Sequence, residues 1–157
     1  MNRRALTAAV SLSITLVVLA SNVTAALAAQ PWSLHIEVPE LIGQSGEPFT
    51  ATGSAVDEGV VCPSGTVDEL GTVASGATSG PFTILHVLKR FNCSDASGSF
   101  DVRLLVRLNN ATHKTTASWQ VVSGTGAYAG LGGNGLLVGA PIVPGTSIYD
   151  VYDGKVH

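Results

Sequence analysis

The chain has 157 residues, of which 12% are charged and 45% are apolar, with 18 glycines and a formal net charge of −3. This length suits one domain with a buried core and leaves too little chain for two such domains. Gly, Thr, Ser and Val are frequent, and no long stretch of Ala, Leu, Glu and Lys follows the N-terminus. This composition predicts an all-β fold.

The first 28 residues have the pattern of a secretory signal peptide. Arg3 and Arg4 precede an uncharged apolar run that ends in the small-x-small sequence Ala26-Leu27-Ala28. We expect cleavage after Ala28, which predicts a secreted protein whose single domain comprises residues 29–157. An uncleaved membrane anchor is disfavoured because the run contains several Ser, Thr and Asn residues and no basic stop sequence follows it.

The net charge of the predicted mature domain is negative, which disfavours negatively charged binding partners. Without Arg3 and Arg4, six basic residues remain against eleven acidic ones, which gives a net charge of −5. An acidic domain repels phosphate groups, so neither nucleic acid nor an anionic membrane is an expected partner.

The mature chain opens with a strand pattern. Residues Ser33–Val38 alternate between apolar and polar side chains, which predicts a half-buried strand. The turn-forming stretch Gln44–Pro48 follows, and Phe49–Val56 is predicted as a second strand. Val60–Cys62 and Thr66–Val73 are weaker candidates for short strands.

Cys62 and Cys93 are the only cysteines in the chain. Two cysteines in an exported protein predict a disulfide. Closing a loop of roughly 32 residues stabilises a fold by about 3.7 kcal/mol when the effect is treated as lost chain entropy. A reactive thiol or a metal pair is disfavoured, since the chain has no CxxC sequence.

Three consecutive strands are predicted in the middle of the chain, at Phe82–Phe91, Ser99–Leu108 and Ala111–Val122. If Asn109-Asn110 forms a two-residue hairpin turn, Phe100 lies opposite Trp119 and Val102 lies opposite Ala117. Apolar residues then pair on one face and polar residues on the other, which favours this register over a one-residue slip.

The preceding hairpin is predicted to pair Lys89 with Asp101. This register places His86 and Arg90 on the inner face together with Trp119. It also leaves an outer apolar patch that consists of Leu85, Val87 and Leu105. An apolar outer face predicts a further covering layer, for which a homo-oligomer is the candidate.

The most distinctive stretch is Gly124–Gly135, GTGAYAGLGGNG, in which six of twelve residues are glycine. Glycine runs between apolar flanks predict strand corners and bulges. Closing strands are predicted at Gly135–Val143 and Ser147–Val156, which brings the count to about eight. The glycine stretch and the later Asp150-x-Tyr152-x-Gly154-x-Val156 sequence together resemble the late-barrel signature of the allene oxide cyclase and dirigent barrel superfamily.

This resemblance covers Ser33–His157 and implies an antiparallel, calycin-like closed barrel that holds a small apolar molecule. It also implies a homo-oligomer, with a trimer favoured as in the plant relatives. The polar catalytic set of the plant enzymes has no counterpart at matching positions, so catalytic residues are unknown. The four histidines show no paired spacing, and we expect neither a metal nor a cofactor.

Three functions remain open at the level of sequence. The leading hypothesis is a non-catalytic binding module for a small apolar or aromatic molecule, with His86, Arg90 and Trp119 as ligand contacts. The alternatives are a cyclase-type isomerase that acts inside the barrel, and an extracellular structural protein without a ligand. An isomerase requires a carboxylate or ordered water deep in the barrel, a binding module requires mostly apolar walls, and a structural protein requires a filled interior.

Overall fold

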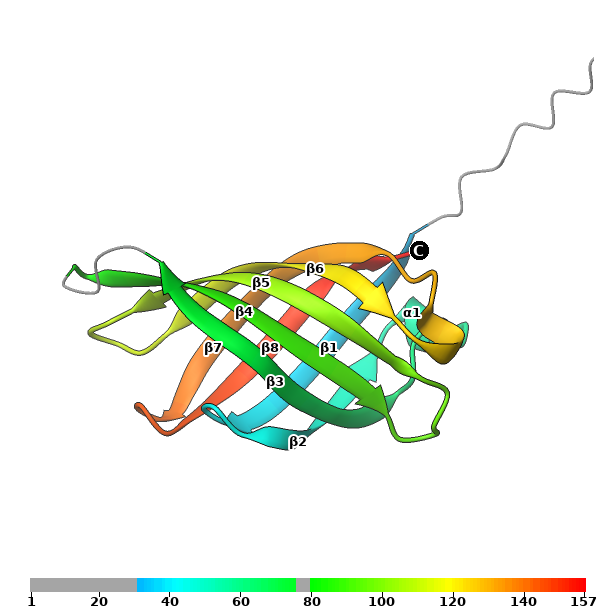
Figure 1. Ribbon diagram of the computed structural model, residues 1–157, viewed down its shortest axis with the longest axis horizontal. Helices are drawn as coiled ribbons and strands as arrows, with labels where there is room; N and C mark the ends of the chain where they lie inside the picture. The colour runs from blue at the N-terminus through cyan, green and yellow to red at the C-terminus, as the bar shows by residue number, and fades with distance from the viewer. Residues whose placement is uncertain (1–30, 76–79) are drawn as a thin grey trace, which may run out of the picture.

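Eight antiparallel strands close into a barrel in which each strand pairs with the next and β8 pairs with β1 (Figure 1). This computed structural model describes residues 31–75 and 80–157, so the predicted signal peptide and its cleavage site lie outside the described residues. The strands are β1 (Trp32–Leu41), β2 (Ser45–Thr52), β3 (Ser64–Ser75), β4 (Phe82–Cys93), β5 (Ser99–Asn109), β6 (Thr115–Gly124), β7 (Gly133–Val143) and β8 (Ser147–Val156). The predicted all-β, eight-stranded closed barrel is therefore confirmed.

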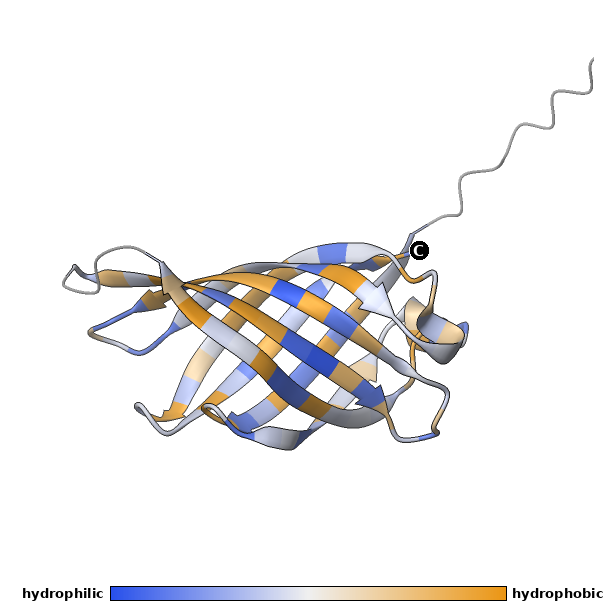
Figure 2. Cartoon of the chain, viewed as in Figure 1, coloured by the Kyte–Doolittle hydropathy of each residue, from blue (hydrophilic) through white to orange (hydrophobic). Residues whose placement is uncertain are grey.

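The barrel core follows from alternation along the strands. In β1, Leu34, Ile36 and Val38 are buried while the residues between them are more exposed. Figure 2 shows the same alternation of apolar and polar residues along the strands. None of the helices in the described ranges is long and apolar enough to span a membrane.

The segment after β2 differs from the prediction of a strand at Phe49–Val56. β2 ends at Thr52, and the one-turn helix α1 (Ser54–Asp57) follows. Gly53 has a φ of 104°, which turns the chain out of the sheet, and Ala55 is fully buried. The predicted short strand at Val60–Cys62 is also wrong, since these residues lie in the irregular connection between α1 and β3.

The β5–β6 hairpin keeps the predicted faces but not the predicted pairs. Leu104 lies opposite Trp119 and Val102 lies opposite Val121, which is a shift of four residues from the predicted register. The connection is longer than two residues because the Asn109 side chain accepts hydrogen bonds from two backbone N–H groups of a wider loop. An even shift preserves the side-chain direction, so Trp119 is buried as predicted.

The β4–β5 register differs from the predicted one by a single residue. Phe91 lies opposite Phe100, and Lys89 lies opposite Val102. An odd slip exchanges the two faces of β4, so Lys89 points inward while His86 and Arg90 lie on the outer face. The predicted inward orientation of His86 and Arg90 is wrong.

Of the three residues predicted to form an outer apolar patch, only one lies on the outer face. Leu85 and Val87 line the barrel interior, and Leu105 is 49% exposed on the outside. The most exposed apolar side chains near Leu105 are instead Leu136 and Val138 of β7, across the β6 strand. The homo-oligomer, with a trimer favoured, stays a prediction.

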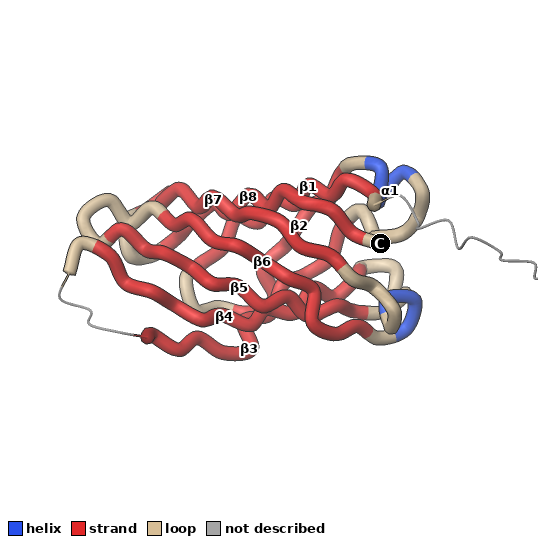
Figure 3. The backbone as a smooth tube through the Cα atoms, turned by 90° about the horizontal axis from the view of Figure 1, so that it is seen from above, coloured by secondary structure: helices blue, strands red, loops and turns tan. Residues whose placement is uncertain are grey.

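One end of the barrel is filled by side chains and cross-linked by a disulfide, and we call it the closed end. Both short helices, α1 and η1 (Gly126–Tyr128), lie at this end beside the C-terminus (Figure 3). Inside it, aromatic rings contact one another at centroid distances of 5.0–5.6 Å, and these are Phe49, Phe91, Phe100, Tyr128 and Tyr152. The predicted disulfide between Cys62 and Cys93 is present at the same end, with a Cα–Cα distance of 5.9 Å.

The glycine stretch allows close backbone approach at the closed end. A Cβ atom on Gly124 would overlap the carbonyl oxygen of Tyr128, whereas a Cβ on Gly130 would meet no atom within 4 Å. We therefore expect Gly124→Ala to lower the free energy of unfolding by about 1–3 kcal/mol, the usual cost of overpacking. Gly130→Ala is the matched control and should be close to neutral. Denaturant titration of both variants measures the difference, and equal stabilities would contradict this account.

Candidate functional site

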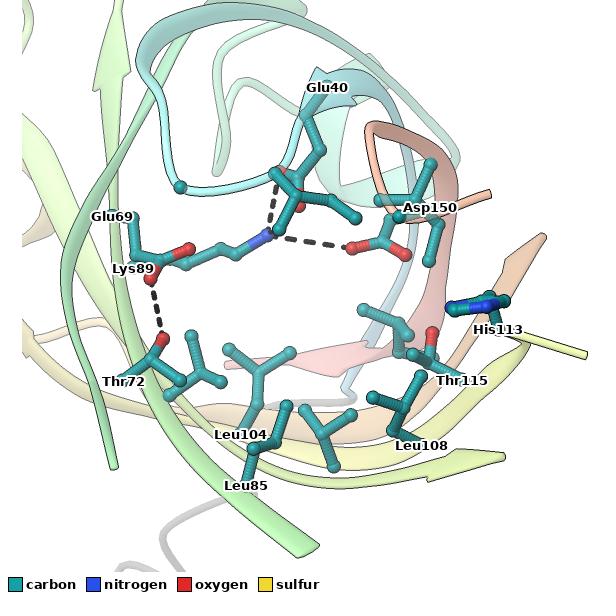
Figure 4. A pocket seen from close by; sticks show the side chains of 17 residues that line it. Glu40, Glu69, Thr72, Leu85, Lys89, Leu104, Leu108, His113, Thr115 and Asp150 are labelled. Carbon is teal, nitrogen blue, oxygen red and sulfur yellow. Dashed lines mark hydrogen bonds and ion pairs between the residues drawn. The ribbon is translucent and has the colours of Figure 1, made fainter. Parts of the chain in front are cut away.

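The other end of the barrel, which we call the open end, contains a cavity of about 340 Å³. Figure 4 shows the side chains that surround it. Its walls are mainly aliphatic and come from β4, β5, β7, β8 and the connection after β1, namely Ile42, Leu85, Val87, Leu104, Val106, Leu108, Leu137 and Ile148. The interior is therefore divided into an aromatic half that is filled and an aliphatic half that is hollow.

A buried group of charged side chains forms one wall of the cavity, and we call it the triad of Glu40, Lys89 and Asp150. The Lys89 ammonium donates hydrogen bonds to both carboxylate oxygens of Glu40, at 2.5 and 2.6 Å. It also lies 3.5 Å from Oδ2 of Asp150. The three side chains come from β1, β4 and β8, and each is no more than 12% exposed.

Burial sets the ionisation of the triad. It raises the pKa of Glu40 and of Asp150 above their ordinary values, and the ammonium of Lys89 opposes this effect only in part. Burial alone would lower the pKa of Lys89, but the negative charges of the Glu40 and Asp150 carboxylates outweigh it and raise that pKa. Lys89 is therefore a permanent cation at physiological pH, and it faces two carboxyl groups that protonate more readily than usual.

Three buried oxygen atoms near the cavity have no hydrogen-bond partner among the residues that the structure describes. They are Oδ1 of Asp150, Oγ1 of Thr115 and the hydroxyl of Tyr152. Asp150 and Thr115 line the cavity, and a Cβ atom added to Gly139 would overlap both of their unpaired oxygens. Gly139 thus leaves space for two polar side chains that converge on one wall. Burial also raises the pKa of Tyr152 above its usual range, so the phenol stays neutral.

The three residues predicted as ligand contacts are not brought together. His86 is exposed on the outer face and is 3.1 Å from the hydroxyl of Ser75. Arg90 also lies outside, where its guanidinium donates hydrogen bonds to Asp101 at 2.7 and 3.0 Å.

Trp119 is inside the barrel but does not line the cavity. Its indole N–H donates to the carbonyl of Leu136, and its ring occupies the space that Gly135 and Gly154 leave free. Its predicted role as a ligand contact therefore lacks support from the geometry of the cavity.

Sequence reasoning missed the triad for two reasons. Lys89 stands in an apolar strand, where a charged side chain is normally assigned to the outside. Its two carboxylate partners lie 49 and 61 residues away along the chain, so no local spacing connects the three. One signal was available, because an inward Val87 implies an inward Lys89 two residues later.

The arrangement can enclose an apolar molecule and present charged groups to one side of it. It can also hold a proton on a carboxyl group whose pKa is raised, which general acid–base chemistry requires. No group of His, Cys, Asp and Glu side chains suited to a metal ion is present within residues 31–75 and 80–157. Comparisons of the chain with protein-family models, with curated proteins and with solved structures find no match.

Proposed function

We propose that this protein is a binding module that encloses a small, mainly apolar molecule at the open end of the barrel. The observation that carries the proposal is the aliphatic cavity of about 340 Å³ inside an otherwise packed barrel. Cavities of roughly 300–1,000 Å³ with mainly apolar walls and a few polar groups are typical of small-molecule sites. A purely structural barrel has no need of this volume, because side chains alone can fill eight strands.

Export is part of the proposal. The Cys62–Cys93 disulfide supports it, since disulfides form and persist in oxidising compartments. The signal-peptide pattern before Ala29 supports it independently. Outside the cell, an enclosed barrel shields an apolar molecule from water.

Adjacent residues of β5 provide a matched test of ligand binding. Val106 lines the cavity and is 7% exposed, while Leu105 points outward and is 49% exposed. We expect octanol to bind the wild-type protein with a dissociation constant in the micromolar range, on the order of −8 kcal/mol. Val106→Phe should weaken this binding at least tenfold because the ring occupies the cavity, and Leu105→Phe should leave it unchanged.

Isothermal titration calorimetry measures the affinities, and circular dichroism checks that both variants are folded. Equal binding to the two variants would place the ligand elsewhere on the protein. Failure of octanol, of longer and aromatic alcohols and of octylamine to bind the wild type would overturn the proposal.

A cyclase-type isomerase is the second candidate function. The buried carboxyl groups of Glu40 and Asp150 favour it, because their raised pKa values suit proton transfer inside an enclosed site. Chromatographic comparison of a bound ligand before and after incubation distinguishes the two functions. A binding module returns its ligand unchanged, whereas an isomerase returns a rearranged product of the same mass that Asp150→Asn no longer forms.

A further inference from the structure

The side chains that line the cavity include more acidic than basic groups. Glu40, Glu69 and Asp150 contribute three carboxyl groups, and Lys89 contributes the only ammonium or guanidinium group among the lining residues. His113 is the remaining titratable side chain in the lining. With the carboxyl groups ionised, the cavity therefore carries a surplus of two negative charges.

Lys89 has no capacity left for an anionic ligand. Its ammonium is held by both oxygens of Glu40 and lies beside Asp150, and the side chain is only 5% exposed. A ligand carboxylate in the cavity would thus approach Glu40 and Asp150 without gaining a free cation. Burial makes this repulsion larger than it would be in water.

In contrast, the cavity wall contains oxygen atoms that can still accept hydrogen bonds from a ligand. Oδ1 of Asp150 has no hydrogen-bond partner among the described residues, and Asp150 as a whole is 5% exposed. The hydroxyl of Thr115, on the same wall, is unpaired as well. On β3, beside Lys89 in the sheet, the Glu69 carboxylate accepts a hydrogen bond from Thr72 at 2.5 Å but has no lysine or arginine partner within the described chain.

We infer that the natural ligand is a small apolar molecule with one protonated amine, and that the cavity rejects carboxylates. This inference rests on the proposed function, because it assigns a chemical class to the ligand of the same cavity. The aliphatic walls hold the apolar body of the ligand, and the surplus carboxylates with the unpaired acceptors stabilise its ammonium group. A protonated amine is a cation with three donors, which matches both the charge and the acceptors of this wall.

Octylamine, octanol and octanoate test the inference, because they share one body and differ in the head group. At pH 7 we expect octylamine to bind on the order of tenfold more tightly than octanol, and a hundredfold more tightly than octanoate. Isothermal titration calorimetry with the full mature protein, at ligand concentrations below micelle formation, measures the three affinities.

Glu69→Gln supplies a variant that spares the buried triad. Glu69 is only partly buried, so the variant should fold, and it should weaken octylamine binding several-fold while octanol binding is unchanged. Glu58→Gln makes the same change of net charge at an exposed position after α1, at the closed end, and should alter neither affinity.

The outcomes separate the two proposals. Octanoate binding as tightly as octylamine, or tighter, would overturn the amine inference and leave the binding function standing. Equal effects of Glu69→Gln and Glu58→Gln would also overturn it, because the preference would then reflect overall charge. If none of the three ligands binds, the proposed function fails and the inference fails with it.

Discussion

Replacing Lys89 with methionine is expected to lower the free energy of unfolding at pH 7 by about 3–5 kcal/mol, the cost of leaving a buried charge without its partner. Methionine retains most of the length and apolar volume of the lysine stem, so the loss comes mainly from the missing ammonium. The carboxyl groups of Glu40 and Asp150 then remain buried without a cation. Denaturant titration measures the difference from wild type.

The effect of Lys89→Met should depend on pH in a defined direction. The folded-state pKa values of Glu40 and Asp150 are already raised, and removal of the ammonium raises them further. A raised folded-state pKa destabilises the fold as pH rises through it, and this penalty is absent below the unfolded-state values of about 4. The stability difference between wild type and variant should therefore be largest at neutral pH and should shrink towards pH 4.

Two controls make the Lys89 prediction specific. Lys114→Met removes the same charge at an exposed position and should change stability by less than about 0.5 kcal/mol. The triple variant Glu40→Gln, Lys89→Met, Asp150→Asn removes all three charges and should recover much of the lost stability. A Lys89→Met variant as stable as wild type at pH 7 would show that the ion pairs do not matter for folding.

Reduction of the Cys62–Cys93 disulfide should lower the free energy of unfolding by about 3.7 kcal/mol, from the loop entropy that the bond removes from the unfolded chain. The two cysteines are 31 residues apart in sequence, and their side chains are 4% and 8% exposed. The bond ties the turn before β3 to the end of β4, close to the aromatic cluster. A change of this size would shift the denaturation midpoint of so small a barrel strongly.

Parallel titrations with and without reducing agent measure this effect on one sequence, so no side-chain volume changes. Cys62 and Cys93 are the only cysteines in the chain, and reduction therefore acts at one place. Superimposable curves, with reduction verified by thiol titration, would contradict the prediction.

The sequence predicted the barrel because strand alternation and glycine corners are local properties. β8 has the predicted bounds of Ser147–Val156, and β5 extends only one residue beyond the predicted Leu108. Registers were harder to predict. The β5–β6 turn was taken as two residues from Asn109-Asn110, and a wider loop moved the pairs by an even number that left the faces intact.

The triad of Glu40, Lys89 and Asp150 could not be predicted, because the register of β4 could not be predicted either. β4 is apolar on both faces, so its alternation does not say which face is inward, and the choice of the wrong face turned His86 and Arg90 into site residues. The inward face instead carries Lys89, whose burial is acceptable only because Glu40 and Asp150 come from the other side of the barrel. No short segment of the sequence contains a pattern that indicates an ion pair between residues so far apart along the chain.

The separation of the two ends has a consequence for how this barrel could diversify. The connections at residues 42–44, 110–114 and 144–146 all contribute to the mouth of the cavity, through Ile42, His113 and Gly145 among others. The aromatic cluster and the disulfide lie at the opposite end. Residues in these connections can therefore be exchanged with little effect on folding, since surface loops on a rigid scaffold tolerate substitution and insertion. Libraries randomised at these three connections, on an otherwise constant barrel, should yield proteins that select different guest molecules.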